Sequence, residues 1–245
     1  MPATDPVRPE PPIMDAVRYR LTMLCFTWHE YRGLFMINEA RRQALSNAAM
    51  GFFGQMRVVL ADAMFVSLCA LEAKAKVGGQ EQVSFEAMFA EAGTAIDKNP
   101  QLGTKARAYL AEFHRLMVPL RSHRDKRIAH ADVDAVLGGK PLPTLTIEDL
   151  SNSIKLAFRT FNAMAVAIGG GPTVFQHPAI AGDCDAVIHA LEAAERFDAI
   201  DQWRWRVASP TMSGEEVRQE LITKFFDPPW KAVRPRDADN FDDLY

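Results

Sequence analysis

The sequence predicts an all-α protein, an antiparallel helical bundle with extra helices toward its C-terminal end. Apolar residues recur at steps of three and four over long stretches, which is the period of a helix rather than the alternation of a strand. Five prolines stand in residues 2–12 and the next is Pro100, so the chain between them can be helical throughout. The connecting stretches carry glycine, proline or capping residues, and no stretch predicts a strand.

The helical patterns follow one another in a definite order along the chain. Leu21, Leu24 and Trp28 belong to the first pattern, and Gly78 with Gly79 closes the third. Ser84 is the predicted N-cap of a shorter helix that ends near residue 95. The first three predicted helices cover 14–32, 36–45 and 47–76.

A buried stripe on the next helix steps by four and three from residue 104 onward, through Ala106, Leu110, Phe113, Met117 and Leu120. Pro119 lies within this stripe, and proline removes a backbone hydrogen bond from a helix interior. It therefore predicts a fresh or kinked segment from 119 to about 134. Thr146 predicts the cap of a helix to about 168, and weaker patterns predict helices over 181–206 and 214–226.

Glycine and proline content divides the chain into four expected segments. These are a flexible proline-rich head over 1–12, a helical bundle over 13–172, a C-terminal helical extension over 173–226 and a peripheral tail over 227–245.

Composition excludes several classes of protein. The 28 Lys and Arg against 31 Asp and Glu give a net charge of -3, which excludes a broadly basic nucleic-acid coat but permits a local basic site. Cys25, Cys69 and Cys184 are widely spaced without a CxxC pair, which argues against a disulfide framework and a structural zinc site. No secretory segment or membrane span is evident, so we expect a soluble, cytoplasmic protein without a cofactor or membrane partner.

The segment 121–132, RSHRDKRIAHAD, concentrates the charges that could carry chemistry. Its first seven residues hold four positive charges and one negative charge, a local +3. Extending the buried stripe past Leu120 places Arg124 on the core-facing side, where an arginine requires a carboxylate, an interface or an anion. Because Pro119 would start a new segment, this cluster would also lie near free helix amides that favour anions.

A flanking face of the same segment gathers His123, Arg127, His130 and Asp134 within about 60° on an ideal helix. A histidine exchanges protons near neutral pH, and fixed cations bind phosphate, so these side chains suit RNA cleavage. The expected phosphate-binding residues are Arg121, His123, Lys126 and Arg127. On a straight helix, however, Arg124 and His130 point about 120° apart. A shared site then requires side-chain reach, a helix distortion or pairing across a dimer axis.

The run from Arg124 to His130 resembles the Arg–polar–x4–5–His signature of the HEPN superfamily of all-α domains. The run over 45–53, which leads into a long helix with Asp62, resembles the abortive-infection AbiU-type branch. The resemblance covers roughly residues 15–170. It implies a bundle that dimerises and, in many members, a metal-independent endoribonuclease leaving cyclic phosphate ends. It further implies Arg124 as the phosphate and transition-state contact, Asp125 as the orienting polar residue and His130 as the acid–base group.

Three functional hypotheses follow. The first is an endoribonuclease of toxin–antitoxin or phage-defence systems, with RNA, a second copy of the chain and a cognate antitoxin protein as candidate partners. The second is a non-catalytic HEPN-like module that binds a protein, a nucleotide or RNA. The third is a helical protein of unrelated role in which Arg124 pairs with a buried carboxylate, Asp62 being one candidate.

Other candidate sites carry weaker patterns. Arg107 and His114 form a second arginine–histidine pair, but Ala108 follows the arginine, which predicts an exposed helix face. Cys25 and Cys69 lie on apolar stripes and are predicted core residues rather than nucleophiles.

A zinc site made of His123, His130 and Asp134 is conceivable in geometry but lacks a fourth nearby ligand. The glycine-rich stretches lack the GKS or GKT that a nucleotide loop requires. Trp203 and Trp205 favour docking of the last helix on the bundle over stacking with RNA bases.

Overall fold

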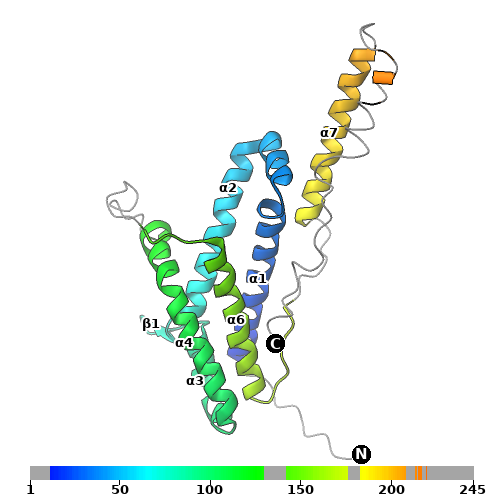
Figure 1. Cartoon of the computed structure of the whole chain (residues 1–245). Helices are drawn as coiled ribbons and strands as arrows, with labels where there is room; N and C mark the ends of the chain where they lie inside the picture. Colours follow the sequence, from blue (N-terminus) through cyan, green and yellow to red (C-terminus); the bar gives the residue numbers. More distant parts are fainter. Residues whose placement is uncertain are drawn as a thin grey trace, which may run out of the picture. The chain divides into compact units, whose positions relative to one another are not determined.

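The computed structural model describes residues 12–129, 142–175, 183–207, 213, 215, 216 and 219, with the backbone alone at 127–129 and 198–207. Six α-helices, one π-helix and one short hairpin lie within these residues, which confirms the predicted all-α helical bundle (Figure 1). In chain order they are α1 (Pro12–Phe35), α2 (Glu39–Glu72), β1 (Lys76–Val77), β2 (Gln80–Glu81), α3 (Phe85–Asp97), α4 (Pro100–His123), η1 (Arg124–Ala129), α6 (Ile147–Ala167) and α7 (Cys184–Val207).

The chain divides into two compact units. Among the described residues, the first unit comprises 12–27, 61–129 and 142–175, and the second comprises 28–60 and the residues from 183 onward. The boundaries fall inside α1 and α2, so each of these helices contributes to both units. The four segments expected from the sequence remain a prediction.

The first unit is built around α6, which packs along α4, while α3 packs against both (Figure 1). Aromatic rings fill the space between them: Phe85 of α3 meets Phe113 of α4 edge to face, with ring centroids 5.3 Å apart. Phe158 of α6 stacks on Phe175 at 4.6 Å. Complete burial of one such side chain stabilises the fold by about 1.5–3 kcal/mol.

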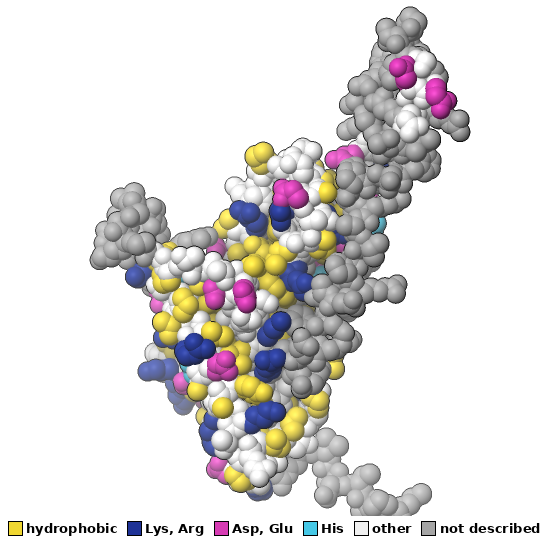
Figure 2. Space-filling view, viewed as in Figure 1, with side chains coloured by type: hydrophobic (Ala, Val, Ile, Leu, Met, Phe, Trp, Pro, Cys, Tyr) yellow, Lys and Arg dark blue, Asp and Glu magenta, His cyan; other side chains and the backbone are white. Residues whose placement is uncertain are grey.

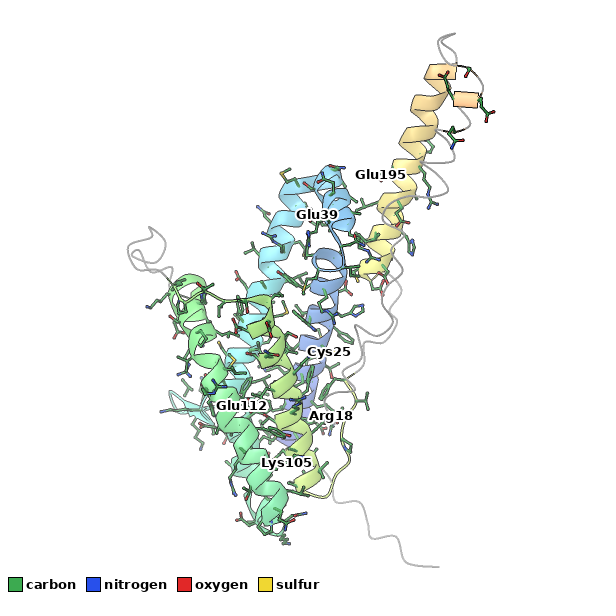
Figure 3. The ribbon with its side chains drawn as sticks, viewed as in Figure 1. Arg18, Cys25, Glu39, Lys105, Glu112 and Glu195 are labelled. Atoms are coloured by element: carbon green, nitrogen blue, oxygen red, sulfur yellow. The ribbon has the colours of Figure 1, made fainter. Side chains whose placement is uncertain are left out.

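The N-terminal part of α1 lies beside α6 in this unit, and Figure 3 labels Arg18 and Cys25 on it. The guanidinium of Arg18 lies over the ring of Phe161 at 5.5 Å from its centroid. The Cys25 thiol donates to the carbonyl oxygen of Phe175 at 3.5 Å. These contacts fix α1 against α6 and the segment that follows it.

Two predicted helix starts are confirmed by their caps. The Ser84 hydroxyl oxygen accepts a hydrogen bond from the Ala87 amide at the start of α3. Thr146 and Asp149 form a capping box at the start of α6, in which each side chain accepts from the backbone amide of the other. Capping satisfies amides that have no partner inside the helix.

Two helices are predicted over 36–45 and 47–76, and α2 does consist of two helical segments, which meet at a kink at Ala49 where φ is -164° and ψ is 74°. The break lies three residues later than predicted. One other expectation in the first half of the chain is corrected. The sequence predicts no strand, but β1 and β2 pair as a minimal antiparallel hairpin. Gly78 and Gly79 form its turn at φ of 59° and 83°, a conformation that favours glycine.

Of the two alternatives predicted at Pro119, a fresh or a kinked segment, the fresh start is wrong. The α-helix α4 continues through Pro119 to His123, and the change of helix type occurs at Arg124, where η1 begins. A proline inside a helix removes one amide donor, and tertiary packing can hold the helix together across it. The buried stripe supplies that packing, since Phe113, Met117 and Leu120 are fully or almost fully buried.

Among the described residues, α2 is the one helix long and apolar enough, by length and composition, to cross a membrane. Core helices of soluble proteins meet the same criteria, so one such helix is weak support for a membrane span. Many of its apolar side chains are nevertheless exposed, namely those of Met50, Phe52, Val58, Val59 and Val66. The absence of a membrane partner and the cytoplasmic location remain predictions.

The second unit has an apolar cluster of its own. Leu34 and Phe35 at the end of α1 pack with Leu45 of α2 and with Cys184 and Ile188 of α7. All five side chains are buried, so α7 is fixed to this unit by its first turns.

Candidate functional site

The candidate site lies in the first unit, where the C-terminal half of α2 meets the end of α4. Phe65, Cys69 and Glu72 follow one another on α2 at steps of four and three, which places them on one face of the helix. His114 and Arg121 are seven residues apart on α4 and both contact this face. The site therefore depends on side chains from two helices that are distant in the sequence.

Glu72 is the carboxylate at the centre of this contact. Its side chain is only 11% exposed, and its Oε1 accepts a hydrogen bond from Nη2 of Arg121 at 2.5 Å. The same oxygen lies 3.1 Å from Nδ1 of His114. One carboxylate thus holds a guanidinium and an imidazole from α4, which fixes the end of α4 against α2.

Arg124 is half-exposed and contacts the residue that follows it. Its Nε donates to Oδ1 of Asp125 at 2.7 Å, and its Nη2 forms an ion pair with the same oxygen. Of the two side chains, Arg124 keeps 36% and Asp125 keeps 44% of its surface exposed. The expectation that Arg124 faces the core is wrong, because the buried stripe ends at Leu120 and the α-helical step ends at His123.

Cys69 lies next to these charges and is itself almost completely buried. Burial raises the pKa of the Cys69 thiol from 9.0 to about 11, and the positive charge of Arg124 opposes this shift in part. Burial therefore favours the neutral thiol over the thiolate at this position, as expected of a core cysteine. Cys25 is also buried, which confirms the prediction that both cysteines are core residues.

His123 connects the end of α4 to the segment that leads into α6. Its Nε2 donates to the carbonyl oxygen of Pro143 at 2.5 Å, which requires the Nε2-protonated tautomer or the imidazolium. Its ring also lies 6.4 Å from the ring of Phe65 on α2. His123 is thus held in place on two sides.

Of the remaining predicted site residues, the structure describes Lys126 in full and Arg127 by its backbone alone. Lys126 is exposed. The side chain of Arg127, and all of His130 and Asp134, lie outside the described residues, as do two of the three ligands in the zinc site considered above. The phosphate-binding and catalytic roles of all these residues remain predictions.

The basic residues Arg121, His123 and Arg124 lie at the C-terminal end of α4, where it continues into η1, and not at the start of a new α-helix. The expected anion attraction of free helix amides therefore does not apply here, since these amides belong to a helix N-terminus. Basic side chains are instead favoured near a helix C-terminus, where carbonyl groups carry partial negative charge. Arg121 and His123 occupy that last turn.

Residues 124–129 form the π-helix η1. A π-helix bonds residues five apart and therefore turns by a smaller angle per residue than an α-helix. The ideal-helix projection that separates Arg124 from His130 by about 120° no longer applies to this segment. Short π-helical segments are frequent at functional sites.

The second arginine–histidine pair is only partly as predicted. Arg107 is 57% exposed and forms an ion pair with Asp97, as an exposed face requires. His114 is only 31% exposed and contacts Glu72, so its assignment to an exposed face is wrong. Glu72 is not among the predicted site residues, although its spacing from Phe65 and Cys69 places it on the same face of a helix and could have indicated it.

Electrostatics limit what this site can do. The guanidinium groups of Arg121 and Arg124 face the carboxylates of Glu72 and Asp125, so their charges are balanced within the site. On the face of α4 and α6 shown in Figure 2, lysine and arginine side chains are interspersed with apolar ones and do not merge into a basic surface. The binding of phosphate or RNA at this site remains a prediction.

Comparison with known proteins identifies one family. The family model HEPN_AbiU2, described as AbiU2, matches residues 12–187, which is more than two thirds of the chain. No curated protein and no solved structure matches the chain.

Proposed function

The chain belongs to the HEPN_AbiU2 family, and we propose that it is a metal-independent endoribonuclease of the HEPN type. The observation that carries this proposal is the gathering of Arg121, His123 and Arg124 around the end of α4. This cluster immediately precedes the segment that bears His130.

The proposed reaction transfers a phosphoryl group within the RNA. His130 removes the proton of a 2′-hydroxyl, the O2′–phosphorus bond forms, and the phosphorus–O5′ bond breaks as the 5′ oxygen takes up a proton. The products are a cyclic 2′,3′-phosphate end and a 5′-hydroxyl end. Arg124 stabilises the charge that builds on the phosphate oxygens, and Asp125 orients its guanidinium through the 2.7 Å hydrogen bond.

We further propose that two copies of the chain associate, and that the protein acts in the cytoplasm in phage defence or as a toxin with a cognate antitoxin. The exposed apolar side chains of α2 support association, because clustered exposed apolar surface marks interaction sites. Phe52 and Val59 are 58% and 59% exposed and lie seven residues apart on one face.

The test is cleavage of one structured and one unstructured RNA in the presence of EDTA, with the product ends identified. Arg124→Ala and His130→Ala are expected to lose at least about a hundredfold in rate, the contribution of one transition-state donor or acid–base group. Arg107→Ala is a matched control for the arginine, since Arg107 is exposed on α4, the helix that precedes Arg124. His189→Ala is the control for the histidine, since His189 is 78% exposed on α7. Full activity in both site variants would refute the assignment.

A second candidate function is a non-catalytic HEPN-like module that binds a protein, a nucleotide or RNA. The observation that favours it is the pairing of Arg121 with Glu72 and of Arg124 with Asp125, because an anion must compete with these carboxylates. Wild-type protein that retards RNA in a gel, yet yields no cyclic phosphate ends under any condition in the test above, would favour this candidate.

A further inference from the structure

Three metal-ligating side chains converge in the second unit. His29 and Glu30 of α1 and Cys184 of α7 each place a ligand atom such that all three atoms lie within 4.8 Å of one another. His29 and Cys184 are buried, and Glu30 is half-buried. We propose that these three residues bind one zinc ion.

The identity of the metal follows from the donor set. One imidazole nitrogen, one carboxylate oxygen and one thiolate sulfur are the ligands that zinc accepts together, whereas magnesium and calcium take oxygen ligands. Around a tetrahedral zinc ion these donor atoms lie about 3.3–3.6 Å apart, as bond lengths of about 2.0–2.3 Å require. The three donor atoms, all within 4.8 Å of one another, would therefore have to move closer together when zinc binds. Three protein ligands leave a fourth position for water or another ligand.

The sulfur of Cys184 packs directly against the backbone of α1 at Gly33. Gly33 lies one helical turn after His29 and Glu30 on α1, and a Cβ atom at Gly33 would lie 2.1 Å from Sγ of Cys184. Glycine is less favourable than alanine in a helix, and at position 33 the missing methyl group leaves room for the Cys184 sulfur. The space above Gly33 gives the thiol its place on the same side as the histidine and the glutamate.

The start of α7 holds Cys184 in that place. Asp183 accepts hydrogen bonds from the amides of Asp185 and Ala186, which makes Cys184 the first residue of the helix. Zinc binds a cysteine as the thiolate, so binding at Cys184 would release the proton of its thiol. The preorganised position of the ligand lowers the entropic cost of binding.

Arg41 links the same start of α7 back to α1. Its Nη1 donates to the carbonyl oxygen of Gly33 at 3.1 Å and to Oδ1 of Asp185 at 3.2 Å. Its positive charge is therefore compensated by Asp185. A thiolate from Cys184 and a carboxylate from Glu30 would together match the charge of a divalent cation.

The spacing of the three ligands in the sequence does not predict this site, because α7 is distant from α1 along the chain and no CxxC or HxxxH pattern is present. The site lies in the second unit, whereas Arg124 belongs to the first. The zinc proposal is thus independent of the proposed ribonuclease activity.

The test is metal binding by the full chain after removal of metal with a chelator. Zinc is titrated against a coloured competing chelator, and cobalt is used as a spectroscopic substitute. We expect one zinc per chain, an intense sulfur-to-cobalt absorption band, and no competition from a large excess of magnesium. Cys184→Ser should abolish the band, and Cys184→Ser and Glu30→Gln should each weaken zinc binding about tenfold or more. Both substitutions are nearly isosteric, so the test does not depend on replacing the buried His29.

Two further variants distinguish the site from adventitious binding. Cys25→Ser removes another buried thiol and should leave zinc affinity and the cobalt band unchanged. Gly33→Ala keeps all three ligands but displaces the Cys184 sulfur, and it should weaken binding. Absence of stoichiometric zinc binding in the wild type, or equal affinity in Cys184→Ser, would overturn the proposal. Loss of the cobalt band in Cys25→Ser would do the same.

Discussion

Glu72 of α2 and Arg121 of α4 form an ion pair in which Oε1 and Nη2 lie 2.5 Å apart, 49 positions apart in the sequence. Glu72 is 11% exposed and Arg121 is 43% exposed, so the pair lies at the boundary between core and solvent. The side chain expected to bind phosphate is thus held by a carboxylate from another helix. The position of the end of α4 depends on this contact as well as on apolar packing.

A double-mutant cycle measures the strength of this pair. Unfolding free energies of wild type, Glu72→Gln, Arg121→Gln and the double variant should give a coupling of about 0.5–1.5 kcal/mol, reduced by the exposure of Arg121. The matched control is the exposed pair of Arg107 and Asp97, for which the coupling should be at most about 0.5 kcal/mol. Equal coupling in the two cycles would show that Glu72 contributes no more than a surface carboxylate.

The exposed face of α2 predicts a specific effect on association. Combined Phe52→Gln and Val59→Gln substitutions should convert a dimer to a monomer, because they replace the most exposed apolar pair on one face of the helix. Light scattering coupled to size-exclusion chromatography measures the mass, and circular dichroism checks that the helices persist. Val118→Gln is the control, since Val118 is 60% exposed on α4. A wild-type monomer, or a dimer that survives both substitutions, contradicts this assignment of the interface.

The buried thiol of Cys69 predicts that the stability of the fold decreases at alkaline pH. Its folded-state pKa of about 11 exceeds the ordinary 9.0 because burial disfavours the thiolate. A raised pKa means that the folded state binds the proton more tightly, so this contribution to stability is complete below pH 9 and is lost between pH 9 and 11. The stability of wild type should therefore fall more steeply over that range than the stability of Cys69→Ala. Parallel curves for the two proteins would contradict the burial of the thiol.

Local sequence signals accounted for much of the fold. Ser84 and Thr146 marked helix starts correctly because a cap is a short-range hydrogen bond to the next turn. The stripe through Phe113 and Met117 was also correct, because burial follows the helical period. Both signals are contained within a few neighbouring residues.

The errors have a common physical origin in long-range packing. Pro119 would interrupt an isolated helix, but α4 continues through it because the buried stripe packs against the core. No pattern in the sequence predicts that the π-helix η1 begins at Arg124. Extrapolating the stripe past Leu120 then placed Arg124 in the core. The partnership of Glu72 with Arg121 required the packing of α2 on α4, which spacing alone does not give.

The capping box at the start of α6 predicts that its removal lowers the free energy of unfolding, and that the contribution of its carboxylate depends on pH. Thr146→Ala removes the hydroxyl that accepts from the Asp149 amide at 3.1 Å, and it should cost about 1 kcal/mol of unfolding free energy. Thr104→Ala is the control, because the Thr104 hydroxyl only donates to the Pro100 carbonyl within α4 and caps nothing. Its effect should be within about 0.5 kcal/mol of zero.

Hydrogen bonds from the Thr146 amide and hydroxyl hold the pKa of Asp149 below its ordinary value of 3.8. A lowered pKa means that the unfolded state binds the proton more tightly, so this contribution is present above pH 3.8 and is lost as the pH falls through the folded-state pKa. Asp149→Asn removes the titrating group. Wild type should therefore be more stable than Asp149→Asn at neutral pH, and the difference should shrink on acidification. Chemical unfolding at neutral pH and at successively lower pH measures this difference, and a gap that stays constant or widens in acid would show that the box does not depend on the ionised carboxylate.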